Sequence, residues 1–296
     1  MIQLDMIDLH THTDYSDGRQ SLAELLQKAE SQNLEYLSIT DHNTVDAYAE
    51  LNDPKVRNLF SGKIIPGIEV EFSYKDTHNE FLGYGFDIDK ISQVEWFTIE
   101  FRKATELKYV RDLYNIFNRL GFSLPSDEEI VKAVEDKGSA RPLLIKTLES
   151  TENIAHAKEA LGIQDANDFR KWRHKHVLRP GSKYEVERPK TPDIVEASKI
   201  IRDAGGLVFM AHIFRTGDRA FEMLDYAVEN KLIDEIEAYY HDMSVAHTQE
   251  QIEQLLEYAK KHGLLVSGGS DCHRVENPLA TIPIDQVGFV RKVATI

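Results

Sequence analysis

The sequence has one cysteine and no long apolar run. Cys272 stands alone among 296 residues, so no disulfide can form within the chain, and we expect a reducing compartment, the cytoplasm. No apolar stretch approaches the ~18 residues that a membrane-spanning helix needs, and the first residues lack the pattern of a secretory signal. Hydrophobic residues make up 42% and charged residues 29%, which excludes collagen-like, low-complexity and disordered classes.

Basic residues are scarce overall but locally enriched. The net charge is −15, so we expect no stable binding to duplex nucleic acid. Residues 99–190 hold 18 Lys and Arg against 15 Asp and Glu, a net charge of +3, which leaves −18 for the rest. The segment from Arg170 to Lys183 contains six of these basic residues and no acid. It is either a solvated helix face or a phosphate-binding surface in which Trp172 stacks on a base.

The two ends of the chain alternate short apolar stretches with helical patterns, and the middle is helical. Strands are expected near residues 7–11, 36–40, 63–71, 81–85, 207–211, 233–239 and 264–267. Capping boxes at Ser21 with Glu24 and at Ser126 with Glu129 mark two helix starts. The β/α alternation predicts an α/β fold with a parallel sheet or barrel. We assign residues 1–98 and 191–296 to this barrel and residues 99–190 to an inserted, all-helical subdomain.

Two pairs of candidate metal ligands have the spacing i, i+2. In a strand His10 and His12 share one face, so both imidazoles can converge on one ion. Taken alone, such a pair is explained equally well by buried structural histidines. The same spacing recurs at Asp271 and His273, between which Cys272 is expected to point away.

Further acids and imidazoles follow predicted strands. Asp17 lies in a loop, His42 follows Asp41, Glu69 ends the third strand and His212 follows the apolar run before it. Taken singly, each has a simpler interpretation as a turn, cap or surface residue, and Asp41 can orient an imidazole. Catalytic residues of barrels come from the carboxyl ends of strands. Ligand-type residues at five such ends therefore predict a polynuclear metal site.

Taken together, these motifs resemble the PHP (polymerase and histidinol phosphatase) superfamily. The matching segments are His10-Thr11-His12, Ser16-Asp17-Gly18, Thr40-Asp41-His42-Asn43, Gly67-Ile68-Glu69, Ala211-His212 and Gly269-Ser270-Asp271-Cys272-His273. The helical insertion, with Ala140-Arg141-Pro142 inside it, resembles the branch of nucleoside 3′,5′-bisphosphate phosphatases and 5′→3′ oligoribonucleases. The resemblance implies a distorted (β/α)7 TIM-like barrel whose helical insertion is a substrate-binding cap.

The resemblance also implies two or three divalent metal ions, which can be Mn, Fe, Zn or Mg. One ion would be held by His10, His12, Glu69 and Asp271. Glu69 would bridge to a second ion shared with His212, and a third would be held by Asp17, His42 and His273. The candidate catalytic residues are Asp17, His42, Glu69, His212 and Asp271.

Two positions depart from the family pattern. Glu80 stands where the family usually has a histidine ligand of the second ion, and His78 reaches the site only if the strand slips. A carboxylate there favours harder ions such as Mn or Mg over Zn. Leu143 stands where this branch often has a histidine after Arg-Pro, which bears on substrate choice.

The implied activity is hydrolysis of phosphate monoesters or short phosphodiesters through a metal-bound hydroxide. The expected partner is a small phosphorylated molecule, most simply a nucleotide or short oligonucleotide. Arg141, Lys183 and Arg215 are candidates to bind its phosphate, or else surface cations. The sequence indicates no oligomeric state.

Three other functions are compatible with parts of this pattern. One is a phosphatase for a small metabolite such as histidinol phosphate, against which the helical insertion argues. Another is a degenerate PHP module that binds metal or a partner without turnover. Glu80 is the only feature of the sequence that favours it. The third is a metal-dependent amidohydrolase, which also begins with His-x-His but normally needs a lysine ligand, and no lysine stands at a predicted strand end.

Overall fold

The computed structural model describes residues 6–75, 77–178, 181–242, 245–293 and 295–296. The chain divides into two compact units. The first unit combines residues 1–98 with residues 191–296, and the second consists of residues 99–190. Each unit has its own cluster of buried apolar side chains.

The first unit is built on one eight-stranded sheet in the order β7-β6-β5-β4-β3-β2-β1-β8. Its strands are β1 Met6–Asp8, β2 Leu34–Ile39, β3 Lys63–Tyr74, β4 Thr77–Tyr84, β5 Leu207–Met210, β6 Glu235–Tyr240, β7 Leu265–Gly269 and β8 Ile282–Pro283. Strand β4 is antiparallel to both of its neighbours and β8 is antiparallel to β1, whereas the other pairs are parallel.

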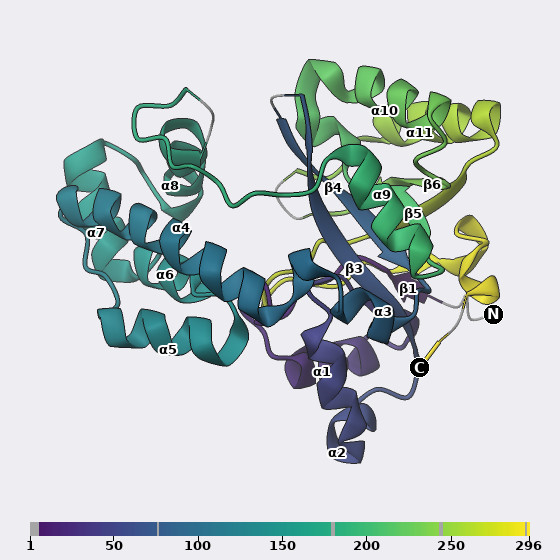
Figure 1. The fold of residues 1–296 in the computed structure, drawn as a ribbon, viewed down its shortest axis with the longest axis horizontal. Helices are drawn as coiled ribbons and strands as arrows, with labels where there is room; N and C mark the ends of the chain where they lie inside the picture. The colour runs from purple at the N-terminus through teal and green to yellow at the C-terminus, as the bar shows by residue number, and fades with distance from the viewer. Residues whose placement is uncertain (1–5, 76, 179–180, 243–244, 294) are drawn as a thin grey trace. The chain divides into compact units, whose positions relative to one another are not determined.

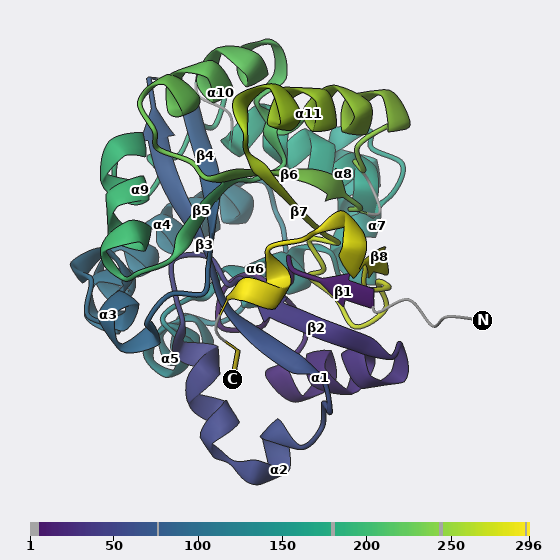
Figure 2. The same cartoon turned by 90° about the vertical axis from the view of Figure 1, so that its right-hand side faces the viewer.

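The sheet curls until its two ends meet, as Figure 2 shows. Leu9 N donates to Gly268 O at 3.2 Å, and Thr11 forms a parallel bridge with Cys272. These contacts join the chain beyond β1 to the chain at the end of β7, so the sheet is a nearly closed barrel. The predicted distorted TIM-like barrel is confirmed.

Helices cover the outside of this sheet (Figures 1 and 2). They are α1 Leu22–Ser31, α2 Pro54–Arg57, α3 Ile88–Ser92, α9 Ile194–Asp203, α10 Ala220–Glu229 and α11 Gln249–His262. Short 3₁₀ helices span Asp46–Asn52, Glu95–Phe97, Ile213–Arg219, Ile284–Gln286 and Val290–Lys292. The predicted capping box of α1 is confirmed, because Ser21 Oγ accepts from Glu24 N and the Glu24 carboxylate accepts from Ser21 N.

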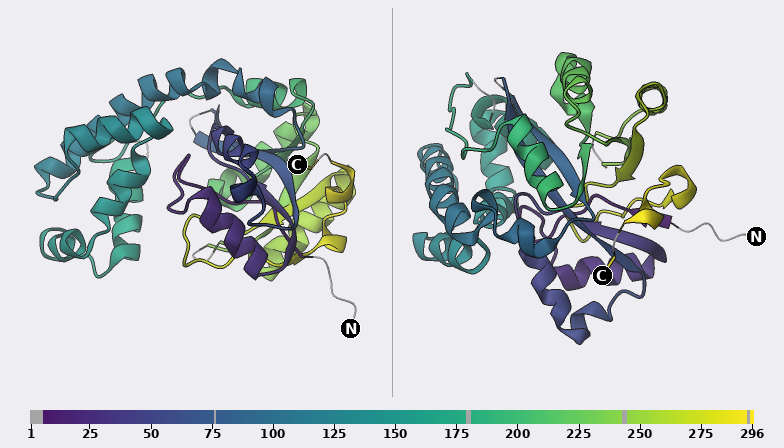
Figure 3. Two further views of the ribbon diagram at one scale, coloured as in Figure 1. Left: turned by 90° about the horizontal axis from the view of Figure 1, so that it is seen from below. Right: turned by 45° about the vertical axis from the view of Figure 1, so that its right-hand side comes forward.

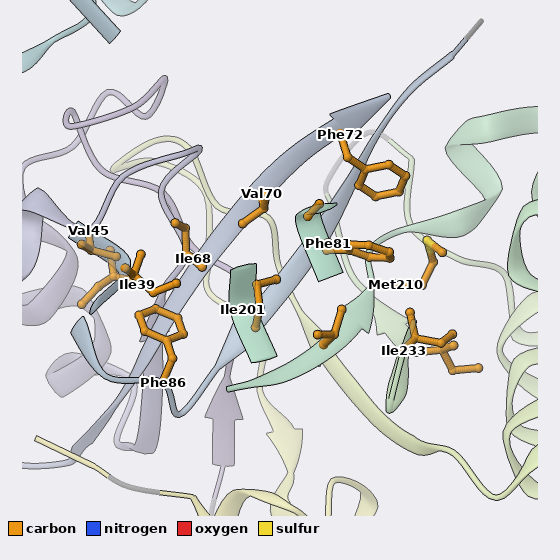
Figure 4. Packing of buried hydrophobic residues seen from close by; sticks show 14 of the residues in the cluster. Ile39, Val45, Ile68, Val70, Phe72, Phe81, Phe86, Ile201, Met210 and Ile233 are labelled. Atoms are coloured by element: carbon orange, nitrogen blue, oxygen red, sulfur yellow. The ribbon is translucent and has the colours of Figure 1, made fainter. Parts of the chain in front are cut away.

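Alternation along the strands separates an outer core from an inner one. On β3, Ile68 and Val70 face outwards, where Ile201 of α9 and Phe81 of β4 pack on them (Figure 4). Ile65 points the other way, into a second cluster inside the barrel. Glu69 shares the inward face with Ile65 because the two are four residues apart, so alternation turns this acid into the barrel.

Helices are the only regular secondary structure among the described residues of the second unit (Figure 3). Its helices are α4 Ile99–Arg119, α5 Asp127–Lys137, α6 Arg141–Leu148, α7 Thr151–Leu161 and α8 Ala166–Arg173, followed by a π-helical turn, His174–Leu178. The predicted capping box at Ser126 and Glu129 is present at the start of α5. Phe117, Phe122 and Phe169 pack against one another at its centre, with ring centroids 5.2–6.1 Å apart.

The strand boundaries require three corrections. Strand β1 ends at Asp8, so His10 and His12 lie beyond it. Beyond the ladder with β2, Thr11 N donates to the Thr40 hydroxyl at 3.1 Å, and Thr40 N donates to Thr11 O at 2.8 Å. Strand β3 continues past Glu69 to Tyr74, because this half of the strand pairs with the antiparallel β4. The two-residue strand β8 carried no signal in the sequence.

Every helix in the described part of the chain is too short or too polar to cross a lipid bilayer.

Candidate metal centre

The chain brings His10 to the end of β7 by a very close backbone approach. Thr11 pairs with Cys272, and His12 N donates to Cys272 O at 2.9 Å. A Cβ atom at Gly269 would lie 2.3 Å from His10 Cβ, so a glycine is required there. The two segments that carry the i, i+2 pairs therefore lie side by side.

Four of the predicted ligands form a buried first group: His10, His12, Glu69 and Asp271. Glu69 Oε2 lies 3.2 Å from His10 Nε2 and 3.2 Å from His12 Nε2. Asp271 Oδ1 lies 3.0 Å from His12 Nε2 and 3.4 Å from His10 Nε2. Two imidazole nitrogens and two carboxylate oxygens thus surround one point.

The second group consists of Glu69, Glu80 and His212. Glu69 Oε1 lies 2.9 Å from His212 Nε2, so the two carboxylate oxygens of Glu69 face different groups. Glu80 comes from β4, and its Oε2 lies 3.9 Å from His212 Nε2. Glu80 therefore lies in one group with Glu69 and His212, and its role as a metal ligand stays a prediction. His78 belongs to none of these groups in the described part of the chain.

The third group contains the predicted Asp17, His42 and His273 and also His12. Asp17 Oδ1 lies 3.1 Å from His273 Nε2, 3.7 Å from His42 Nε2 and 3.8 Å from His12 Nδ1. A neutral imidazole offers one lone pair, so His12 cannot serve both the first and the third group at once. Its Nε2, buried between Glu69 and Asp271, assigns it to the first.

Unpaired buried atoms test whether these groups suit metal ions. His10 Nε2, both ring nitrogens of His12, Asp17 Oδ1 and His42 Nδ1 are buried and have no hydrogen-bond partner among the described residues. Such atoms are costly unless something satisfies them. Imidazole nitrogens combined with carboxylate oxygens are ligands of Zn, Mn, Fe and related divalent ions. The chemistry and geometry of the groups therefore fit bound divalent cations.

Two of the ligand-type residues have unusual backbone angles. Asp271 has a φ of 51° and His212 a φ of 20°, although neither is a glycine. Backbone of this kind is strained and persists only where its surroundings hold it. Asp271 belongs to the first group and His212 to the second, so both residues with this backbone are in ligand groups.

Opposite charges shift the pKa values of these residues strongly. Burial lowers the pKa of His42, but Glu69 and Asp17 outweigh burial and raise it to about 8. Burial likewise opposes the charge of His273, whose pKa Asp17 and Asp271 raise to about 10. Burial raises the pKa of Asp271, but His10 and His273 hold it well below its usual range. The Asp271 carboxylate therefore stays ionised, as a metal ligand must be.

Asp41 orients a loop rather than an imidazole, which corrects the sequence-based prediction. Its carboxylate accepts hydrogen bonds from Thr13 N (2.7 Å), Thr13 Oγ1 (2.6 Å) and Ser16 Oγ (2.6 Å). These bonds fix the loop that presents Asp17. The short polar side chains of this loop compete for the Asp41 oxygens and occupy them.

The three predicted phosphate-binding cations lie in different settings. Arg215 is half-exposed, and its Nη1 lies 3.4 Å from Asp271 Oδ2, at the edge of the first group. Arg141, in the second unit, donates from Nε to Glu106 Oε2 at 2.9 Å and lies over the Tyr109 ring. Lys183, also in the second unit, is exposed. Within the basic segment from Arg170 to Lys183, Arg179 falls outside the described residues.

Sequence reasoning missed two side chains of β6 that contact the predicted ligands. Glu237 lies 2.8 Å from His10 Nδ1 through Oε1 and accepts from His212 N through Oε2. Tyr240 Oη donates to Asp271 Oδ2 at 2.8 Å. The available signal was the run Glu235-Ile236-Glu237-Ala238, which places two acids on one face of an otherwise buried strand.

The PHP domain family profile matches residues 8–166. A 5′-3′ exoribonuclease of Haemophilus influenzae is 26% identical over 271 residues, which are 90% of this chain and 89% of that protein. A 3′,5′-nucleoside bisphosphate phosphatase of Chromobacterium violaceum is 24% identical over 274 residues, 90% of this chain and 87% of that protein. The 5′-3′ exoribonuclease Rnm of Escherichia coli is 24% identical over 276 residues, 90% of this chain and 85% of that protein.

Two solved structures share the fold. A candidate metal-dependent phosphoesterase of Bifidobacterium adolescentis superposes with a TM-score of 0.70 at 23% identity, covering 93% of this chain and 90% of that one. An amidohydrolase of Chromobacterium violaceum gives a TM-score of 0.66 at 20% identity, covering 97% and 95%. At 23% and 20% identity, the likeness to these two structures shows a shared fold and nothing further.

Proposed function

The chain belongs to the PHP domain family, and on this premise we propose that it is a metal-dependent phosphoesterase that acts on nucleotides. The substrate class is a nucleoside 3′,5′-bisphosphate or a short 5′-phosphorylated oligoribonucleotide. Relatives that match 90% of this chain carry both activities in their names. One observation carries the proposal: imidazole and carboxylate atoms converge in three groups, and several of the buried nitrogens have no hydrogen-bond partner in the part of the chain that the structure describes.

The metal ligands of this proposal come from the three groups. His10, His12, Glu69 and Asp271 hold one ion, and Glu69, Glu80 and His212 a second. Asp17, His42 and His273 hold a third where all three groups are occupied, and the proposal is for two or three ions. Bound ions of this kind lower the pKa of water and neutralise charge on phosphate oxygens. Five residues, Asp17, His42, Glu69, His212 and Asp271, are the candidate catalytic residues.

Manganese or another hard ion suits the second group best. Its ligand atoms come from two carboxylates and one imidazole. Oxygen-rich sites favour Mn and Mg over Zn. Fe remains compatible with the first group, which offers two imidazole nitrogens and two carboxylate oxygens.

Cations outside the ligand groups bind the substrate in this proposal. Arg215 is half-exposed beside Asp271, so its guanidinium can contact a phosphate and the carboxylate together. Residues 99–190 act as the substrate-binding cap of the barrel formed by residues 1–98 and 191–296. Their net charge of +3, against −18 elsewhere, attracts a polyanion. Arg141 and Lys183 supply the contacts.

The proposal includes a cytoplasmic location and no stable binding of duplex nucleic acid. The single cysteine, Cys272, is buried and needs no oxidising compartment. The overall charge of −15 opposes binding to long nucleic acid.

A phosphate-release screen tests the proposal. The full chain is stripped of metal, reloaded with Mn, Mg, Fe or Zn, and offered nucleoside 3′,5′-bisphosphates, 5′-phosphorylated di- to pentaribonucleotides and histidinol phosphate. We expect release from the first two classes, dependent on added metal. Preferential hydrolysis of histidinol phosphate would replace the nucleotide function by a small-metabolite phosphatase. Metal binding without hydrolysis of any of them would leave a module that binds without turnover.

A further inference from the structure

Strand β6 supplies no member of the three ligand groups, yet two of its side chains bind three members of them. Glu237 is 1% exposed and uses both carboxylate oxygens. Its Oε1 lies 2.8 Å from His10 Nδ1, and its Oε2 accepts a hydrogen bond from His212 N at 2.8 Å. One buried carboxylate therefore holds a residue of the first group and a residue of the second.

The contact to His10 determines which ring nitrogen faces the groups. A carboxylate at 2.8 Å requires a proton on Nδ1, because two acceptors cannot share a hydrogen bond without one. Nε2 is then the nitrogen directed at Glu69 Oε2 and Asp271 Oδ1, 3.2 and 3.4 Å away. A carboxylate behind an imidazole also makes the ring a stronger metal ligand.

The contact to His212 acts on the backbone. His212 has a φ of 20° and a ψ of 52°, which a non-glycine residue adopts only when its surroundings impose it. The hydrogen bond from His212 N to Glu237 is one such constraint. It keeps the turn after β5 in the geometry that directs His212 Nε2 at Glu69 Oε1, 2.9 Å away.

Tyr240 fixes the orientation of Asp271, the ligand-type residue that follows β7. Its hydroxyl donates to Asp271 Oδ2 at 2.8 Å, which leaves Oδ1 directed at His12 and His10. The Tyr240 ring also packs against the His212 ring, with centroids 5.3 Å apart. Asp271, with its φ of 51°, is thereby held at the side-chain end as well.

We infer that Glu237 and Tyr240 are positioning residues of the metal centre. Glu237 fixes the protonation and orientation of His10 and the backbone of His212, and Tyr240 fixes the carboxylate of Asp271. This inference rests on the proposed function only in taking the three groups as metal sites. It does not depend on which phosphate ester is hydrolysed.

The same strand supplies a matched control. Glu235 lies two residues before Glu237 on the same face of β6 and is 0% exposed. Neither of its carboxylate oxygens has a hydrogen-bond partner in the described part of the chain. Glu235→Gln and Glu237→Gln are therefore the same substitution at equal depth in one strand, and only Glu237 touches candidate ligands.

The experiment is calorimetric titration of the chelator-stripped, full-length protein with Mn²⁺. In Glu237→Gln the side chain has one carbonyl oxygen as an acceptor, whereas the two donors, His10 Nδ1 and His212 N, each need one. We expect Kd for the tightest class of ions to rise about 10–100-fold, the range for loss of such an outer partner. We expect a smaller rise for Tyr240→Phe, which removes one hydroxyl. Glu235→Gln should keep Kd within about twofold, and thermal unfolding of each apo variant checks folding.

The outcomes separate this inference from the proposed function. Equal Mn²⁺ affinity in wild type, Glu237→Gln and Tyr240→Phe would overturn the inference, even if the wild type is an active phosphoesterase. Equal weakening in Glu235→Gln and Glu237→Gln would overturn it too, because burial in β6 would then be the cause. If Glu237→Gln does not fold, Tyr240→Phe alone decides. Loss of affinity in both variants, with no phosphoesterase activity in the wild type, would support the inference and reject only the function.

Discussion

Glu69 Oε1 lies 2.9 Å from His212 Nε2, while Glu69 Oε2 lies 3.2 Å from His10 Nε2. The two oxygens of one carboxylate thus face two different ligand groups, and the side chain is 1% exposed. Glu69 comes from the inward face of β3. In the sheet order β3 lies between β1, the strand before His10, and β5, the strand before His212. This arrangement makes the first and second groups a single unit, so loss of a member of one group is expected to disturb the other.

The first prediction is that the first group is required for activity. His12→Ala and Asp271→Ala should each bind fewer Mn²⁺ ions per chain and lose phosphoesterase activity, because each removes a ligand atom from a four-member group. Metal analysis and phosphate release measure the two effects, and circular dichroism checks the fold. His262→Ala is the control, since His262 stacks on Tyr258 of α11 and belongs to no ligand group. Full activity of metal-free wild type would remove the hypothesis.

A second prediction concerns Glu80. With Glu69 and Glu80 as ligands, the second group carries two carboxylates, which favours Mn over Zn and leaves bound water less acidic than a histidine-rich site would. Glu80→His should move the metal preference towards Zn and the activity optimum towards lower pH. Competition titrations with Mn and Zn and a pH–rate profile measure both. His78→Ala should change neither quantity. If Glu80→His behaves as wild type, Glu80 does not contact the ion.

The sequence predicts which residues come together in the ligand groups more reliably than it predicts the contacts that orient them. Ligand-type residues after strands are visible in the sequence because each follows an apolar run. The direction of β4 is not visible, because alternation is the same in parallel and antiparallel strands. Glu69 was therefore placed at a strand end, whereas β3 continues to Tyr74 along the antiparallel β4. The error left the site intact because Glu69 keeps its inward face in either case.

Arg215 supplies a third prediction. Its guanidinium is half-exposed beside Asp271, so it should bind substrate phosphate without holding metal. Arg215→Ala should raise KM for a nucleoside bisphosphate about tenfold or more, the loss of one charge-assisted hydrogen bond, and leave metal content unchanged. Lys261→Ala, which removes an exposed cation of α11, is the control. An unchanged KM would assign Arg215 to the orientation of Asp271 instead.

Arg141 supplies a fourth prediction, in which two roles can be separated. Arg141 donates to Glu106, whose side chain is 6% exposed, so Arg141→Ala leaves a buried carboxylate without this partner. It should lower the stability of the second unit by about 1–3 kcal/mol and also raise KM for nucleotide. Glu106→Gln weakens the same pair but keeps the cation, so it should reduce stability with little change in KM. Equal KM values for wild type and Arg141→Ala would limit Arg141 to a structural role.

The positioning residues mark the limit of prediction from sequence. Glu237 and Tyr240 act through hydrogen bonds to residues at least 25 positions away, and no local spacing encodes such contacts. Asp41 is a similar case. Its place beside His42 suggested contact with an imidazole, but folding brings Thr13 and Ser16 to its oxygens first. Tertiary hydrogen bonding decides these roles, and it follows from the closure of the barrel.

The last prediction concerns Glu235, which is buried inside the barrel. Burial, and after it the charge of Asp234, raises the pKa of Glu235 to about 10, far above the ~4.3 of an unfolded carboxyl. Between these values the folded state keeps a proton that the unfolded state releases. The contribution of the protonated Glu235 to the free energy of unfolding is therefore fully present below about pH 4. It is lost as pH rises towards 10, by up to ~1.4 kcal/mol per pH unit.

Glu235→Gln cannot lose this proton, so its free energy of unfolding should rise relative to wild type at each step from pH 6 to pH 9. Denaturant unfolding in the presence of a chelator measures this difference without a contribution from metal binding. The control is Glu257→Gln at an exposed position of α11, whose free energy of unfolding should change with pH as that of the wild type does. A constant difference between wild type and Glu235→Gln across this range would mean that Glu235 is ionised in the folded protein and is reached by water inside the barrel.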